Sequence, residues 1–234
     1  HYNHMNTINT QEQSDLLNQN GKPPFPETLV ISSERSGLNL VRHIVESLSG
    51  RRTPGKPHLI EKGPLLFHRT HSVPSTIEGP VRTTMYNYHN IPKYSKIILL
   101  LRDPREVFVR AFEKSTDRLL SYCWNINAYD RFKGNKLLIY YDDLITQDMS
   151  FKDIFEFLGM PNLFDESQIA LVRKESLDWY DTYQTKGKGS ITKGDSEKLI
   201  FHQHSLSNED LVQLLTILRS ELGPRYSYLS KWGI

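Results

Sequence analysis

The chain has 234 residues, a length that suits one domain with a sizeable buried core. Its 29 basic and 27 acidic residues nearly balance, which argues against a general nucleic-acid or membrane binder. The single cysteine, Cys123, excludes an internal disulfide framework, and no apolar run approaches the roughly 20 residues of a membrane span. The polar N-terminus lacks the apolar core of a secretory signal, so we expect a cytoplasmic protein with a flexible segment at 1–24 and a single domain at 25–234.

The first predicted unit is a strand, a polar loop and a helix. Leu29-Val30-Ile31 is a short apolar run typical of a buried strand, and apolar residues recur at helical spacing from Leu40 to Leu48. A loop between such elements aims backbone N–H groups and the positive end of the helix dipole at one spot. Arg35 and Ser36 add a cation and a hydroxyl there, so the loop suits a phosphate, although an ordinary strand-to-helix turn remains the alternative.

This loop differs from the phosphate loop of enzymes that hydrolyse ATP or GTP. A Walker A loop carries Gly-Lys followed by Ser or Thr, and no Lys-Ser or Lys-Thr follows Gly37. The hydroxyl that would hold Mg²⁺ is therefore missing, which disfavours nucleotide hydrolysis.

A second strand is predicted at Leu65-Leu66-Phe67, after a loop at 51–64 whose charges we expect to be solvated. In open α/β sheets, ligands gather at the carboxyl ends of the strands, and His71 lies just beyond this one. His71 is therefore a candidate general base, with a purely structural histidine as the alternative. The aromatic and polar segment 83–92 could line an acceptor pocket or form a packed loop.

The strongest strand signal is Lys96–Leu101, which is fully apolar after its first residue, as a central parallel strand should be. We expect Asp103 to cap the next helix, with Pro104 in its first turn. Arg102 therefore lies at the carboxyl end of this strand. Together with the Arg35 loop, it indicates a contact to a second phosphate.

One more strand is predicted at Lys136–Tyr141, followed by an amphipathic helix from Phe151 to Leu158 that Gly159 closes. These alternating elements predict an α/β fold with a central, mostly parallel sheet flanked by helices, similar to P-loop nucleotide-binding proteins.

The C-terminal third predicts a basic loop and a last helix. Lys and Gly alternate from Gln184 to Gly194, which favours a mobile loop whose backbone N–H groups can approach an anion. Ser207 and Asp210 form a capping box for the last helix, which we expect to end at Gly223-Pro224.

Taken together, these segments resemble the sulfotransferases that use 3′-phosphoadenosine-5′-phosphosulfate (PAPS). The first family signature, Lys/Arg-Ser-Gly-Thr-Thr/Asn with an apolar residue after it, is similar to the segment from Arg35 to Leu40. The second signature, an apolar strand ending in Arg-Asp/Asn-Pro, is similar to Arg102-Asp103-Pro104. Three further family motifs resemble Arg69-Thr70-His71, Tyr141-Asp142-Asp143-Leu144 and Lys186-Gly187-Lys188-Gly189, with Lys193-Gly194 as another register for the last.

The resemblance implies a role for each matched residue. The 5′-phosphosulfate end of PAPS would be bound by Arg35, Ser36, Gly37, Leu38, Asn39 and Leu40. The 3′-phosphate and the adenine would be bound by Arg102, Tyr141, Lys186, Lys188 and Gly189.

Three residues depart from the family pattern. Glu34 replaces the usual proline, and Leu38 replaces a phosphate-binding threonine. Arg110 stands where the family has a serine on the 3′-phosphate, so Arg110 either pairs with that phosphate or points away from it.

The implied reaction is in-line transfer of a sulfuryl group to a hydroxyl or amine of a small-molecule acceptor, without a metal. His71 would take the acceptor proton, and Arg35 would stabilise charge on the leaving phosphate oxygen. The alternatives are a phosphate-loop enzyme similar to nucleotide kinases and a non-catalytic module that binds a nucleotide or polyanion.

Overall fold

The structure is a computed structural model that describes residues 26–55, 58–73, 91–110, 114–187 and 206–234. The segment 1–24, most of the predicted pocket segment 83–92, and Lys188 and Gly189 lie outside the described residues.

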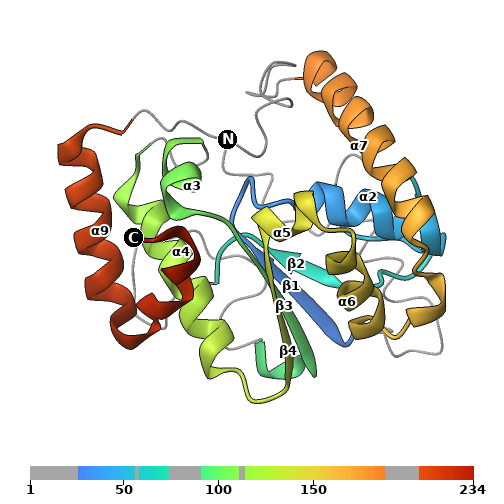
Figure 1. The fold of residues 1–234 in the computed structure, drawn as a ribbon. Coiled ribbons are helices and arrows are strands. Elements are labelled where there is room, and N and C mark those ends of the chain that lie inside the picture. Colours follow the sequence, from blue (N-terminus) through green and yellow to red (C-terminus); the bar gives the residue numbers. More distant parts are fainter. Residues whose placement is uncertain (1–25, 56–57, 74–90, 111–113, 188–205) are drawn as a thin grey trace.

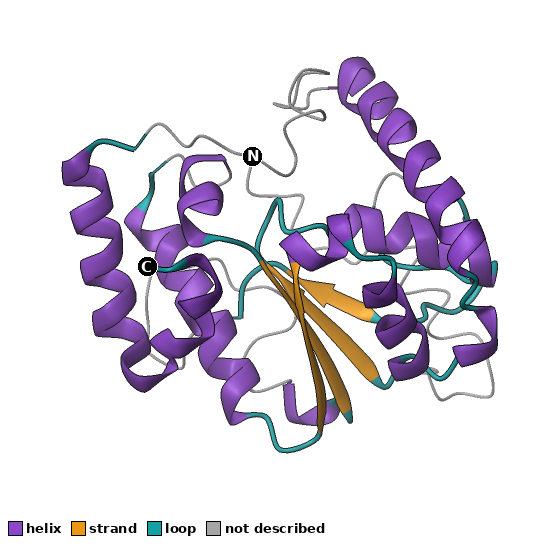
Figure 2. Ribbon diagram, viewed as in Figure 1, coloured by secondary structure: helices purple, strands orange, loops and turns teal. Residues whose placement is uncertain are grey.

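The centre of the fold is a four-stranded parallel sheet (Figures 1 and 2). Its strands are β1 (Thr28–Ser32), β2 (His68–Thr70), β3 (Lys96–Leu101) and β4 (Asn135–Tyr140), in the order β2-β1-β3-β4. Each neighbouring pair is parallel, and Leu29 of β1 lies opposite both His68 and Ile97. The predicted α/β architecture with a parallel central sheet is confirmed.

Helices cover both faces of this sheet. Figure 1 shows α2 (Leu38–Ser49), α6 (Met149–Phe157) and α7 (Glu166–Gly187) on one side. The other side is covered by α4 (Thr116–Arg131) and α9 (Asn208–Leu222). Two short helices, α3 (Pro104–Arg110) and α5 (Tyr141–Thr146), begin where β3 and β4 end. The described residues also form the 3₁₀ segments η1 (Ile91–Lys93), η2 (Pro161–Leu163) and η3 (Gly223–Trp232).

Alternate strand residues supply two separate hydrophobic clusters. Leu29 and Ile97 pack in the cluster shared with α4 and α9, whereas Val30 and Ile98 pack in the cluster shared with α2 and α6. This alternation follows from the two-residue period of a strand. Because both faces are buried, β1 and β3 are apolar along their length, which is the pattern that predicted them.

Several predicted helix ends are confirmed by their capping contacts. Asp103 Oδ1 accepts a hydrogen bond from the backbone N–H of Arg105 at 2.9 Å, and Pro104 is the first residue of α3. Ser207 Oγ accepts from the backbone N–H of Asp210 at 3.1 Å, at the start of α9.

Three predicted boundaries were wrong. β2 begins at His68, because only the three residues from His68 to Thr70 align with β1, and Leu65–Phe67 precede it as buried chain. β4 ends at Tyr140, and Tyr141 begins α5. The predicted end of the last helix is confirmed, because α9 ends at Leu222 with Gly223 as its C-cap, and the chain continues from there as 3₁₀ helix.

The third wrong boundary is the start of the predicted basic loop, which does not begin at Gln184. Helix α7 continues through Gly187, because Gln, Thr and Lys are acceptable helix residues and the glycines begin only at Gly187. Lys186 therefore lies in the last turn of a helix.

Candidate functional site

The topology of the sheet locates a ligand site before any side chain is considered. Helix α2 connects β1 to β2 over one face, and α3 and α4 connect β3 to β4, with α4 on the other face. The direction of strand order therefore reverses between β1 and β3. In open α/β sheets, ligands bind at the carboxyl ends of the strands at such a point. The loops 33–37 and 102–103 lead out of these two strands.

Arg102 joins the two loops. Its Nη1 donates a hydrogen bond to the backbone oxygen of Arg35 at 2.7 Å, and its guanidinium lies over the ring of Tyr141, 4.1 Å from the ring centroid. The hydroxyl of Tyr122 donates to the backbone oxygen of Arg102 at 2.7 Å. Arg102 is only 4% exposed, so it has a fixed position. Three residues predicted from separate motifs thus lie together.

The first turn of α2 offers hydrogen-bond donors to a ligand. Gly37 precedes the helix with φ 95°, and no side chain caps it, whereas Ser115 and Ser207 cap α4 and α9. The first turn of α2 contains no acidic residue. Ser36 Oγ is buried and has no hydrogen-bond partner among the described residues. An anion would satisfy these donors and interact favourably with the helix dipole.

The loop residues that follow have different roles from those expected. Leu38 is 5% exposed and packs in the hydrophobic cluster under α2, so it can offer a ligand only its backbone N–H. Asn39 Oδ1 accepts a hydrogen bond from Arg42 Nη1 at 3.0 Å. The side chains of Leu38 and Asn39 therefore belong to the protein's own packing, and Leu40 is half-buried beside the same cluster.

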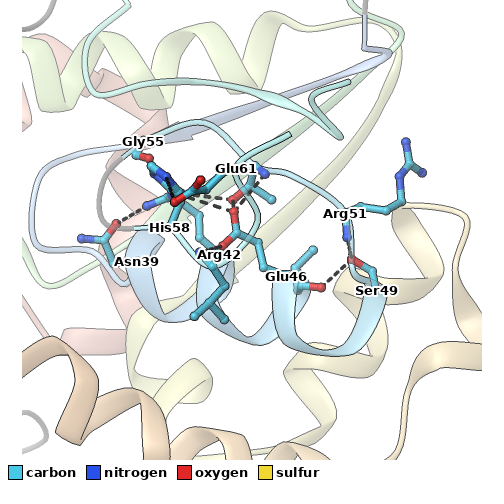
Figure 3. Close-up of polar contacts among 11 residues, drawn as sticks. Asn39, Arg42, Glu46, Ser49, Arg51, Gly55, His58 and Glu61 are labelled. Carbon is cyan, nitrogen blue, oxygen red and sulfur yellow. Dashed lines mark hydrogen bonds and ion pairs between the residues drawn. The ribbon is translucent and has the colours of Figure 1, made fainter. Parts of the chain in front are cut away.

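A buried polar network fixes α2 and the loop after it (Figure 3). Arg42 Nη2 donates to the backbone oxygen of Gly55 at 2.9 Å, and Arg42 Nε donates to Thr53 Oγ1 at 3.1 Å. Glu46 Oε1 accepts from both the backbone N–H and the hydroxyl of Thr53. The charges of the loop 51–64 were expected to be solvated, and Arg51, Glu61 and Lys62 are exposed, whereas Arg52 is buried. Burial of Arg42 and Glu46 is possible because each charge has several partners.

Gly37, which ends the loop after β1, leaves no room for a side chain. A Cβ at this position would lie 2.6 Å from Leu144 Cδ2 and 3.1 Å from Tyr141 Cδ2, and φ is positive. We expect Gly37→Ala to lower the free energy of unfolding by about 2–4 kcal/mol, from backbone strain and steric overlap. Gly50→Ala is the matched control, because Gly50 has φ 65° and no atom near its Cβ position. Urea unfolding should show a loss of only about 1 kcal/mol for the control, and equal losses would contradict the steric argument.

His71 follows β2 directly and is oriented by its Nδ1. That nitrogen lies 2.7 Å from the backbone oxygen of Ser32, and because a carbonyl only accepts, Nδ1 carries the proton. Nε2 lies 3.3 Å from Arg69 Nη1 and accepts from it. Burial lowers the pKa of His71, and the Arg69 cation lowers it further, against an opposing effect of Glu34. His71 is therefore a neutral imidazole whose Nε2 can accept a proton.

Asn125 on α4 positions the segment that contains His71. Its Nδ2 donates to the backbone oxygen of His71 at 3.0 Å, and its Oδ1 accepts from the backbone N–H of Val73 at 2.8 Å. Asn125 is 1% exposed. Neither α4 nor Asn125 was predicted from the sequence. A single polar residue in a segment without a predicted element gives no sign that it holds the backbone of His71 and Val73.

Glu34 and Arg118 form an ion pair between the α2 loop and α4. Glu34 is the residue that replaces the family's usual proline. The Glu34 carboxylate ties the loop to α4, the helix that also carries Asn125. A proline at position 34 could not form this ion pair.

The side chains of two more predicted site residues lie outside the described part of the structure. Arg110 is the last residue of α3, and Lys186 lies at the end of α7. Within the described ranges, no group of three or more His, Cys, Asp or Glu side chains could hold a metal ion. None of the helices in that part of the chain combines the length and apolarity that a membrane crossing requires.

No protein-family model matches the sequence, and no curated protein matches it. Among solved structures, the sulfotransferase domain from the Synechococcus PCC 7002 olefin synthase matches over 85% of this chain and 96% of that chain. The two are 16% identical with a TM-score of 0.41. A likeness of this degree carries no argument about ligands or reaction.

Proposed function

We propose that the protein is a sulfotransferase that moves a sulfuryl group from PAPS to a hydroxyl or amine of a small-molecule acceptor. The observation that carries the proposal is the contact of Arg102 with the Arg35 loop. This contact brings together, at one edge of the sheet, the N-terminus of α2, which has no side-chain cap, and the buried Arg102, which follows β3. Two adjacent anion sites suit a nucleotide with phosphates at both its 5′ and 3′ positions.

The chain's own groups divide between the two ends of that nucleotide. Ser36 Oγ and the N–H groups of the first turn of α2 would bind the 5′-phosphate, with Arg35 balancing its charge. Arg102 would bind the 3′-phosphate, and Tyr141 would contact the adenine. The buried Ser36 hydroxyl, without a partner among the described residues, fits a ligand at this place.

His71 would act as the general base. Bound PAPS would supply the sulfuryl group and the phosphate leaving group. The neutral Nε2 of His71 would accept the proton of the acceptor, and the Nδ1–H bond to Ser32 would keep the ring in the required tautomer and orientation. Arg35 would stabilise negative charge on the leaving oxygen as a permanent cation, because an arginine does not give up its proton. Arg69, which donates to Nε2, would have to shift when the acceptor binds.

The pH profile should reflect the lowered pKa of His71. Since the base works in its neutral form, kcat/KM is expected to fall only below about pH 6.5, the ordinary range of a histidine. Arg69→Gln removes a cation that lowers this pKa, so the acid limb should move to higher pH. Arg51→Gln, at an exposed position, is the control and should leave the limb unchanged. A downward movement in Arg69→Gln would contradict the assignment.

The proposal is tested by calorimetric titration with 3′,5′-adenosine bisphosphate, the desulfated product, in the presence of EDTA. 5′-AMP is the matched ligand, because it differs only in the missing 3′-phosphate. We expect clear binding of the bisphosphate and much weaker binding of 5′-AMP. Equal affinities would overturn the proposal, and turnover of ATP that depends on Mg²⁺ would favour a nucleotide kinase-like enzyme.

A further inference from the structure

The C-terminal segment is attached to both residues that flank Tyr141. The indole Nε1 of Trp232 donates to Asp142 Oδ2 at 3.0 Å. The Trp232 ring also packs edge-to-face on Tyr140, with 5.3 Å between the ring centroids. Trp232 is half-buried in this position. It therefore contacts the last residue of β4 and the second residue of α5, on either side of Tyr141.

Neighbouring residues strengthen this attachment. Lys231 Nζ donates to Asp143 Oδ1 at 2.9 Å and lies over the Tyr140 ring at 5.2 Å from its centroid. The hydroxyl of Tyr140 donates to the backbone oxygen of Tyr228 at 2.9 Å. The junction between β4 and α5 is thus fixed from outside by residues of η3.

The same segment is also attached to the β3–α3 junction. Arg105 Nη2 lies 3.4 Å from the backbone oxygen of Trp232 and 2.7 Å from Asp103 Oδ2. Asp103 directly follows Arg102. Trp232 therefore connects the two chain segments whose side chains meet in the Arg102–Tyr141 stack.

We infer that Trp232 is a positioning residue for the Arg102–Tyr141 pair, and that it acts through Asp142 on the selectivity for a 3′-phosphorylated nucleotide. This inference rests on the proposed function for its ligand. Its structural part, the fixing of α5 by Trp232, stands on the contacts alone. The contacts through which Trp232 would act are those to Tyr140, Asp142 and Arg105.

The test uses Trp232→Phe, which removes the indole N–H and keeps an aromatic ring against Tyr140. We expect the affinity for 3′,5′-adenosine bisphosphate to fall about 5–10-fold, the usual worth of one hydrogen bond of this kind. Tyr228→Phe is the matched control from the same segment, because its hydroxyl bonds Asp130 Oδ1 on α4 instead. The control should bind the bisphosphate as the wild type does.

A double-variant comparison separates positioning from general damage. In an Arg102→Ala background, Trp232→Phe should cause little further loss, because residues that act through one another are not additive. An undiminished loss in that background, or an equal loss in Tyr228→Phe, would overturn the inference. If Trp232→Phe does not fold, Asp142→Asn weakens the same contact from its other end.

Amide hydrogen exchange without any nucleotide keeps this inference separate from the proposed function. Trp232→Phe should accelerate exchange in α5 and leave β1 unchanged. Unchanged exchange in α5 would overturn the inference. A wild-type protein with no preference for the bisphosphate over 5′-AMP would overturn the proposed function, and the exchange result would still decide whether Trp232 fixes α5.

Discussion

His71→Ala is expected to reduce kcat by about 10²–10⁴-fold, the usual contribution of a general base. The affinity for 3′,5′-adenosine bisphosphate should stay within about twofold of the wild type, because the proposed nucleotide contacts come from the loops after β1 and β3 and from Tyr141, and not from His71. The geometry that supports this expectation is the Nδ1 contact to Ser32, which leaves Nε2 as the only acceptor on the ring. Steady-state turnover and calorimetry on the same preparation would give the two values.

The control for His71 is His58→Ala. His58 is exposed and lies 3.9 Å from Glu61, in the loop after α2, so its loss should change neither kcat nor nucleotide affinity. Normal turnover in His71→Ala would remove the general base from the mechanism. Nucleotide binding with no turnover by the wild type, across a range of acceptors, would favour the non-catalytic module.

Local sequence patterns predicted the strands β1 and β3, from which the proposed nucleotide-binding loops lead. The apolar runs of β1 and β3 are continuous because both faces of the sheet are buried, and a continuous apolar run is readable without knowledge of the fold. Arg102 directly follows β3, and Arg35 lies in the short loop after β1. Since parallel strands end at the same edge, their positions at the site followed from strand order alone.

Other parts of the site depend on contacts between residues far apart in the sequence. Asn125 reaches His71 across 54 positions, and Trp232 reaches Asp142 across 90. Neither contact has a local signal, because asparagine and tryptophan occur in many environments. The fold brings these residues to the site only after the helices have packed, so the sequence alone could not assign them.

The resemblance to the sulfotransferases implied phosphate contacts from Leu38 and Asn39, and both residues lie in the first turn of α2. Their side chains, however, pack in the core and bond Arg42 respectively. A motif fixes the course of the backbone, whereas the use of each side chain depends on its neighbours, and here only the backbone N–H groups of these residues remain for a ligand.

Arg102→Ala is expected to lower the affinity for 3′,5′-adenosine bisphosphate by about 10²-fold, since charge-assisted hydrogen bonds contribute roughly 1.5–3 kcal/mol each. The affinity for 5′-AMP, which lacks the 3′-phosphate, should change far less. The ratio of the two affinities, measured by calorimetry, is the decisive quantity. It isolates the 3′-phosphate from any general loosening that follows the loss of the bond to Arg35 and the stack on Tyr141.

Two further variants show whether charge or geometry produces that ratio. Arg102→Lys retains the cation but cannot form two parallel hydrogen bonds to a phosphate, so its preference for the bisphosphate should be intermediate. Arg219→Ala is the control, because Arg219 is an exposed arginine of α9 whose guanidinium lies over the ring of Tyr226. This variant should bind both ligands as the wild type does. If Arg102→Ala weakened both ligands equally, Arg102 would be a structural residue that supports the Arg35 loop. No described residue would then be assigned to the 3′-phosphate. The reason to prefer PAPS over a nucleotide without a 3′-phosphate would be lost.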